Sequence, residues 1–140
     1  MGELENRLAV ERAFEAWEGG RDGGPFDLLA PDARWTITGN SVAAGTYDSR
    51  AEFLSQVIRP FNARMSTPLA PRVHAIYADG DMVIAYFDAS ATVRDGGRYD
   101  NTYTWFLRMR DGAAVEAVAF FDSIAFDDLW RRVAPSYSAS

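Results

Sequence analysis

Asp122 ends the last strand-like run of the chain and is the first candidate for acid–base chemistry. It follows the apolar run Val115–Ala119 and two phenylalanines, and an amphipathic segment comes directly after it. A carboxylate at the mouth of an apolar cavity can act as a general base near neutral pH. Aspartate is also among the best residues for capping the N-terminus of a helix, so capping of the segment that follows is an equal alternative.

Tyr86 and Asp88 form a second candidate pair within the alternating run Met82–Val93. Side chains two residues apart on a strand share a face, and a phenol beside a carboxylate can act as an acid–base pair. The alternative is that this face is the solvated outside of the sheet. The chain's one histidine, His74, lies in another strand-like run, where a structural or exposed role is more common than catalysis.

Missing residue types exclude several kinds of chemistry. The chain has no cysteine and no lysine, which excludes disulfides, thiol nucleophiles and Schiff bases. With one histidine, a multi-histidine metal site cannot form within one chain, and no serine elbow is present for a hydrolase triad. These absences predict a site with no metal and no cofactor, which uses acids and phenols or only binds.

Length, charge and hydropathy limit the class of protein. A chain of 140 residues with 48% hydrophobic residues fits one domain over residues 1–140. A net charge of −6 argues against nucleic acid as a partner. No apolar run reaches the length of a membrane span, and the N-terminus has no basic start followed by an apolar block. We therefore expect a cytoplasmic protein without a membrane partner.

Helices dominate the first part of the predicted fold. Glu3–Glu18 has an apolar stripe at helical spacing and is followed by two glycines. Pro25 is expected to open a short helix. Ser49 and Glu52 form a capping box at the start of a third helix, which Pro60 is expected to end.

Strands dominate the rest of the chain. The expected runs are Ala33–Thr38, Arg72–Ala78, Met82–Val93, Arg98–Met109 and Val115–Ala119, and Ser123–Val133 is expected to form a final helix. Asp-Gly pairs separate the later runs and predict tight hairpins, because such turns need positive φ. The order predicts an α+β fold, with a curved antiparallel sheet wrapped around the helices and a pocket between them.

The odd-numbered face of Arg98–Met109 is mostly aromatic and carries one amide. Such a face suits a pocket with an apolar body and a few polar groups. The residues expected to shape this pocket are Trp35, Asn101, Tyr103, Trp105 and Phe120. Plain core packing or a dimer interface would explain the same aromatic residues.

The order of these elements resembles the SnoaL-like polyketide cyclases and the ketosteroid-isomerase-like proteins of the nuclear-transport-factor-like fold. The resemblance covers nearly the whole chain and rests on the segments Leu28–Ala33, Ala44–Tyr47, Arg110–Gly112 and Phe120–Asp122. It implies a cone-shaped, cystatin-like α+β barrel with an apolar pocket and a homodimer formed through the sheet. It also implies proton transfer by pocket aspartates in isomerisation, cyclisation or dehydration.

The resemblance carries over residue by residue. Asp122 matches the late carboxylate of the polyketide cyclases and of limonene-epoxide-hydrolase-like enzymes, and Asp88 matches the second aspartate of the latter. Tyr86 stands where those hydrolases have arginine, and Trp35 where they have tyrosine. The resemblance therefore implies a cofactor-free enzyme that uses Asp122, with Tyr86 and Asp88, on a small or polycyclic apolar carbonyl compound. Epoxide hydrolysis and a non-catalytic binding or dimerisation module are the alternatives.

Overall fold

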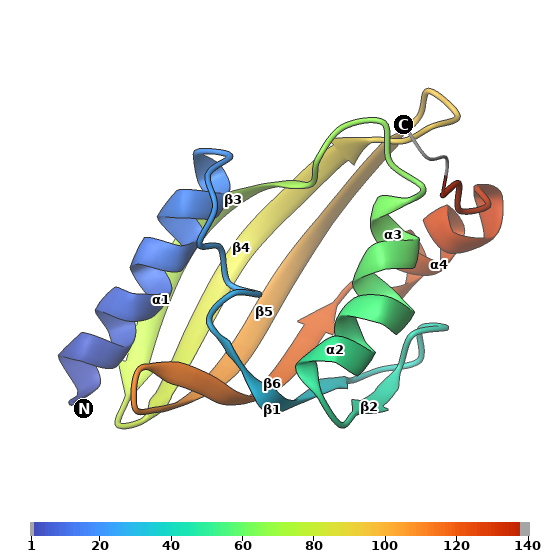
Figure 1. Cartoon of the computed structure of the whole chain (residues 1–140). Helices are drawn as coiled ribbons and strands as arrows, with labels where there is room; N and C mark the ends of the chain where they lie inside the picture. Colours follow the sequence, from blue (N-terminus) through green and yellow to red (C-terminus); the bar gives the residue numbers. More distant parts are fainter. Residues whose placement is uncertain (1, 138–140) are drawn as a thin grey trace.

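A strongly curved six-stranded sheet carries the helices of the chain on its inner face (Figure 1). The structure is a computed structural model that describes residues 2–137, so Met1 and residues 138–140 of the predicted domain lie outside it. The elements in chain order are α1 (Glu3–Glu18), β1 (Leu29–Ile37), β2 (Gly45–Tyr47), α2 (Arg50–Phe53), the π-helical turn η1 (Leu54–Ile58), α3 (Arg59–Asn62), β3 (Ala70–Asp79), β4 (Met82–Thr92), β5 (Arg98–Arg110), β6 (Ala113–Phe121) and α4 (Ser123–Arg132).

The sheet confirms the predicted α+β cone and adds one parallel pair. Its strand order is β2-β1-β6-β5-β4-β3, and β1 runs parallel to β6 while the other neighbours are antiparallel. The sheet is open at β2 and β3, so it is not closed into a barrel. Gly80, Gly96 and Gly112 have φ of 62°, 87° and 82° in the predicted Asp-Gly turns, as those hairpins require.

The predicted helix at Pro25 is wrong. Residues 25–28 form successive turns, in which Asp27 N–H donates to Gly24 O and Leu28 N–H donates to Pro25 O. Strand β1 then begins at Leu29, which pairs with Ala114 of β6. A helix that began at Pro25 would therefore need Leu29 in helical conformation, but Leu29 is paired in the sheet.

Pro60 does not end the third helix. The helical path runs from Arg50 to Asn62, and Arg59 N–H donates to Leu54 O across the π-helical turn. This wider turn gives the proline ring room that an ordinary α-helical turn lacks. At the other end, Ser49 Oγ accepts a hydrogen bond from Glu52 N as predicted, whereas Glu52 Oε2 accepts from Asp48 N.

The inner face of the sheet forms the core. Along β5 the residues at odd positions are buried, and their neighbours at even positions are exposed or half-buried. The buried face packs against α1, the segment α2–α3 and α4 (Figure 1). The predicted parity of β5 is thereby confirmed, and its aromatic side chains point toward the helices.

Candidate functional site

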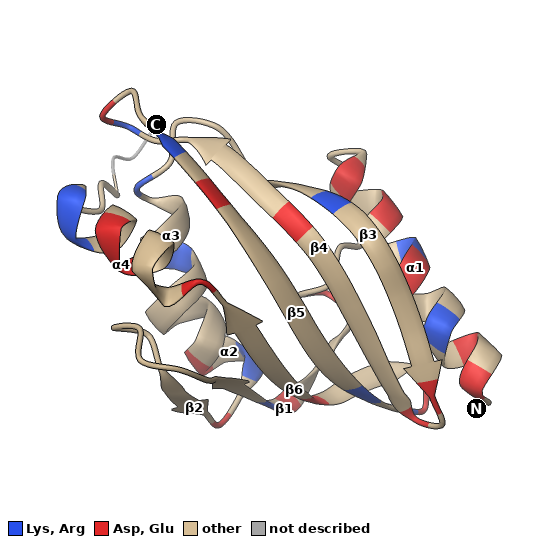
Figure 2. Cartoon of the chain, turned by 180° about the vertical axis from the view of Figure 1, so that it is seen from behind, with Lys and Arg blue, Asp and Glu red and all other residues tan. Residues whose placement is uncertain are grey.

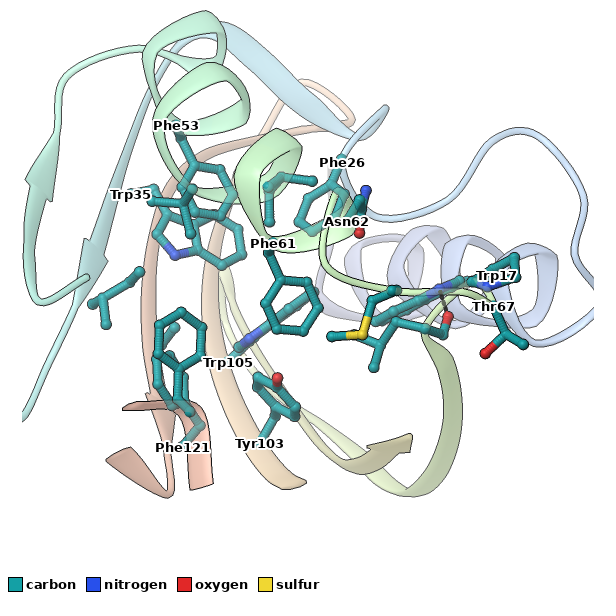
Figure 3. Close-up of a pocket in the computed structure, with 18 of the residues that line it drawn as sticks. Trp17, Phe26, Trp35, Phe53, Phe61, Asn62, Thr67, Tyr103, Trp105 and Phe121 are labelled. Carbon is teal, nitrogen blue, oxygen red and sulfur yellow. Dashed lines mark hydrogen bonds between the residues drawn. The ribbon is translucent and has the colours of Figure 1, made fainter. Parts of the chain in front are cut away.

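An aromatic cavity of about 510 Å³ lies between the inner face of the sheet and the segment of residues 53–69 (Figure 3). This volume is typical of small-molecule sites. The lining residues are Trp17, Phe26, Trp35, Ile37, Phe53, Val57, Ile58, Phe61, Asn62, Met65, Ser66, Thr67, Pro68, Leu69, Tyr103, Trp105, Ala119, Phe121 and Phe126. The aromatic residues of the inner face therefore leave a cavity rather than filling it.

Ring-on-ring contacts hold the cavity walls. Trp35 stacks on Phe53 with centroids 4.2 Å apart and an interplanar angle of 11°, and Trp105 stacks on Trp17 at 5.9 Å and 12°. Trp35 and Trp105 meet edge to face at 5.0 Å. Each ring is held in place by its neighbours, so the flat aromatic rings form fixed walls of the cavity. Such walls suit a planar ligand.

Polar groups in this cavity are few. The lining includes Asn62, Ser66 and Thr67 on one side and Tyr103 on the sheet side. Within residues 2–137, none of the lining residues is an aspartate, glutamate, histidine or arginine. Trp17 Nε1 donates to Leu69 O at 2.9 Å, whereas buried Trp35 Nε1 has no partner among the described residues. The cavity therefore offers hydrogen-bond donors and no carboxylate.

Tyr103 belongs to a buried chain of hydrogen bonds on β5. Its hydroxyl oxygen lies 2.5 Å from that of Tyr99, and Asn101 Nδ2 donates to the Tyr99 hydroxyl at 2.7 Å. Asn101 Nδ2 also donates to Asp122 O at 3.0 Å. This relay, defined as Asn101, Tyr99 and Tyr103, connects the start of α4 to the cavity.

The orientation of the Asn101 amide follows from its neighbours. Asn101 Oδ1 accepts from the backbone N–H groups of Thr102, at 2.8 Å, and Asp122, at 3.1 Å. Backbone N–H groups only donate, so this atom is the oxygen, and the other is the nitrogen. Both hydrogens of that nitrogen are then used, one by Asp122 O and one by Tyr99.

Burial keeps both phenols of the relay protonated. Desolvation raises the pKa of Tyr99 to about 12, although its hydrogen bonds with Tyr103 and Asn101 act in the opposite direction. Desolvation also raises the pKa of Tyr103 well above its ordinary value, and the nearby Tyr99 adds to that shift. At neutral pH Tyr103 is therefore a neutral hydrogen-bond donor, not a phenolate base.

Asp122 lies outside the cavity, at the N-terminus of α4. Its Oδ1 accepts a hydrogen bond from Ile124 N at 3.0 Å, which is N-cap geometry. The residue is exposed and borders a shallow groove on the outer face of the sheet together with Asp88 and Asp100. Figure 2 shows this outer face from behind, with acidic residues on β4 and β5.

Tyr86 and Asp88 also lie on the outer face, but they do not bond to each other. Asp88 accepts from Thr102 Oγ1 at 2.7 Å and lies 2.9 Å from His74 Nε2. These hydrogen bonds, that of Thr102 first, lower the pKa of the Asp88 carboxyl. Tyr86 is 42% exposed and packs against the ring of His74. Asp88 and Asp122 thus share a groove, and neither of them lines the cavity.

Phe120 does not line the cavity, contrary to the expectation from the sequence. It pairs with Thr104 on the outer face and is 49% exposed. Its neighbour Phe121 pairs with Tyr103 and faces inward. Opposite residues of an antiparallel pair share a face, so the register of β6 against β5 decides which phenylalanine enters the cavity.

The cavity contains Trp35, Tyr103 and Trp105 of the predicted residues, and Asn101 lies behind Tyr103 in the relay. Sequence reasoning missed the contribution of the segment Asn62–Leu69, and of Phe53, Phe61 and Phe126. The apolar faces of the helices gave a signal for Phe53 and Phe126, whereas Phe61 lies beyond the expected helix end at Pro60. No alternation marks the loop after Asn62, so its place over the cavity had no sequence signal.

Comparison with known proteins defines the class of this fold and site. The sequence profile of the SnoaL-like domain matches residues 10–117, and the chain belongs to this family. No curated protein sequence matches the chain.

Within the described residues no helix is long and apolar enough to cross a membrane, and no group of three acidic, histidine or cysteine side chains could hold a metal.

Solved structures with the same fold are numerous. Bal32a, from a soil-derived mobile gene cassette, has a TM-score of 0.76 at 23% identity, over 92% of this chain and 98% of its own. A SnoaL-like protein from Jannaschia sp. CCS1 has a TM-score of 0.70 at 18% identity, over 98% and 95%. TerC, co-crystallized with polyporic acid, has a TM-score of 0.71 at 20% identity, over 89% and 97%. At these identities the likeness shows a shared fold.

Proposed function

We propose that this SnoaL-like protein binds a flat, largely apolar carbonyl compound in the aromatic cavity, without a cofactor. The observation that carries the proposal is a cavity of about 510 Å³ with stacked aromatic walls and few polar groups. Burial of planar apolar surface supplies the affinity, and a small number of donors fixes the orientation of the ligand.

The positions of the carboxylates favour binding over chemistry by Asp122. Asp122 caps α4, and Asp88 is held by Thr102 and His74 on the outer face. A general base must come within hydrogen-bond reach of the proton that it removes. Neither carboxylate lines the cavity, which also argues against epoxide hydrolysis there.

Asp-mediated isomerisation, cyclisation or dehydration is the second proposal. It is favoured by one observation: the backbone of Asp122 is hydrogen-bonded to Asn101, which places this residue next to the relay that reaches the cavity. In that case Asp122 must leave its cap and turn toward the ligand. Hydrogen–deuterium exchange at the carbon next to the carbonyl of 1-tetralone, a bicyclic ketone, tests this proposal, because a working base exchanges those hydrogens with solvent.

Calorimetric titration with 9-fluorenone, a rigid tricyclic ketone, tests the binding proposal. Ala119 is 1% exposed and lines the cavity, so Ala119→Leu fills part of it. We expect wild type to bind fluorenone and the filled variant to bind at least about tenfold more weakly, a difference of about 1.4 kcal/mol. The matched control is Val118→Leu. Val118 directly precedes Ala119 on β6 and faces the outer side of the sheet, so this variant should bind fluorenone as wild type does.

Polyporic acid, an aryl-substituted hydroxyquinone, is a second probe, because TerC was crystallized with it. Its flat rings and carbonyl oxygens fit the ligand class that we propose. Equal fluorenone affinity of wild type and Ala119→Leu, or no binding of either probe, would contradict the proposal.

A further inference from the structure

We propose that the Tyr103 hydroxyl is a directed hydrogen-bond donor that selects ligands with a carbonyl oxygen, and that Asn101 and Tyr99 are positioning residues that fix its direction. This inference rests on the proposed binding function and names the group of the ligand that the cavity recognises. It follows from the hydrogen-bond relay behind Tyr103.

The direction of the relay begins at the backbone. The Asn101 oxygen is occupied by the N–H groups of Thr102 and Asp122, so its nitrogen faces Tyr99 and must donate. The Tyr99 oxygen is therefore an acceptor toward Asn101. The single proton of Tyr99 remains available for another bond.

Tyr103 is the partner that can take this proton. Tyr99 is 2% exposed, and among residues 2–137 its hydroxyl has two partners, Asn101 and Tyr103. If Tyr103 donated to Tyr99 instead, the Tyr99 proton would be buried without an acceptor. Donation from Tyr99 to Tyr103 satisfies Asn101 and Tyr99, and the one proton left over is then that of Tyr103, which lines the cavity.

The Tyr103 proton is then left for a ligand. Its oxygen accepts from Tyr99, and no other protein acceptor for its proton is present in the described part of the chain. Figure 3 shows the hydroxyl oxygen directed away from β5, among the aromatic side chains of the cavity. A hydroxyl that already accepts a hydrogen bond is a stronger donor, so the relay strengthens the bond to a ligand oxygen.

A ketone oxygen suits this donor. It accepts hydrogen bonds, carries no charge that burial would penalise, and lies in the plane of a flat ring system that the stacked walls accommodate. A hydrocarbon of the same shape would leave the Tyr103 proton without an acceptor. Discrimination between a ketone and its hydrocarbon analogue is therefore the property that this relay predicts.

The test compares 9-fluorenone with fluorene, which has the same ring system without the oxygen. We expect wild type to bind fluorenone about three- to tenfold more tightly than fluorene. Tyr103→Phe should remove this preference while keeping the affinity for fluorene. The matched control is Tyr77→Phe, because Tyr77 is 59% exposed and does not line the cavity.

The infrared carbonyl band of bound fluorenone gives a readout that a purely structural role of Tyr103 would not move. We expect the band in wild type at lower frequency than in an apolar solvent, and an intermediate position in Tyr99→Phe. If Tyr103→Phe does not fold, the difference in band position between wild type and Tyr99→Phe decides the inference, because the unpaired Trp35 Nε1 is a second donor in the cavity.

Three results would overturn the inference. A wild-type band at the apolar-solvent position, or an undiminished fluorenone preference in a folded Tyr103→Phe, refutes the role of Tyr103 while the binding proposal survives. Binding of neither compound to wild type refutes the proposed function together with this inference.

Discussion

The side chain of Asn101 bonds to both backbone polar groups of Asp122, accepting from its N–H at 3.1 Å and donating to its C=O at 3.0 Å. This contact joins the first part of β5 to the residue between β6 and α4. The same amide donates to Tyr99, so one buried side chain supports both the helix start and the relay to the cavity.

Asn101→Leu should therefore destabilise the fold strongly. The substitution keeps the size of the side chain, but it leaves the Asp122 and Thr102 N–H groups and the Tyr99 hydroxyl without their partner. We expect a loss of about 2–4 kcal/mol in the free energy of unfolding, measured by urea denaturation. Asp100→Asn is the control on the same strand, since Asp100 is exposed and should change stability by less than about 0.5 kcal/mol.

Substitutions of Asp122 separate capping from catalysis. Asp122→Ala should cost about 1 kcal/mol of stability, whereas Asp122→Asn should cost less than about 0.5 kcal/mol, because asparagine caps helices as well as aspartate does. Thermal and urea denaturation of the two variants give these values. Equal destabilisation by both would contradict the capping role. Loss of ketone exchange in a fully stable Asp122→Asn would instead support the second proposal.

Alkaline pH should unfold the protein through its buried tyrosines. The folded-state pKa of Tyr99, about 12, and that of Tyr103 lie above the ordinary value of 10, so between these values the unfolded chain loses protons that the folded chain keeps. Stability is therefore complete below about pH 10 and falls as the pH rises further, by about 1.4 kcal/mol per pH unit for each group.

Denaturation between pH 8 and pH 12 measures this loss, and Tyr103→Phe should make it shallower. The chain has no lysine, so no ammonium group of a lysine side chain titrates in this range. Tyrosinate absorbance should show Tyr99 and Tyr103 ionising only as the protein unfolds, because both are buried. Ionisation of every tyrosine near pH 10 without unfolding would contradict the buried relay.

We propose that the homodimer implied by the family resemblance forms through the outer face of the sheet. Phe120 and Tyr86 are exposed on this face, and each is paired with Thr104, which lies between them on β5. Phe106 packs edge to face on Phe120. We expect Phe120→Arg to shift sedimentation toward the monomer, because a buried unpaired charge opposes association. Ile124→Arg, at an exposed position of α4, should leave the sedimentation unchanged.

Local patterns in the sequence predict most of the sheet. The Asp-Gly turns and the alternation of β5 define the hairpins and the inward side chains, because both depend on neighbouring residues alone. The parallel pairing of β1 with β6 and the inward position of Phe121 depend on register between distant strands. Local patterns do not contain this information, which is why Phe120 was expected in the cavity.

The sequence predicts which residues of β5 share the inner face, but it does not predict how they are hydrogen-bonded to one another. Parity placed Tyr99, Asn101 and Tyr103 on one face, but the direction of their hydrogen bonds depends on which backbone groups reach the Asn101 amide. One of these groups belongs to Asp122, 21 residues away. The carboxylate of that residue caps a helix while its backbone anchors the relay, and the sequence does not separate these two roles.

A crystal structure of the protein with 9-fluorenone tests the central claim most directly. The account predicts planar ligand density inside the aromatic cavity, in contact with Trp35 and Trp105, with the ketone oxygen within hydrogen-bond distance of Tyr103 Oη. An unoccupied cavity with fluorenone bound in the outer groove beside Asp88 and Asp122 would contradict it.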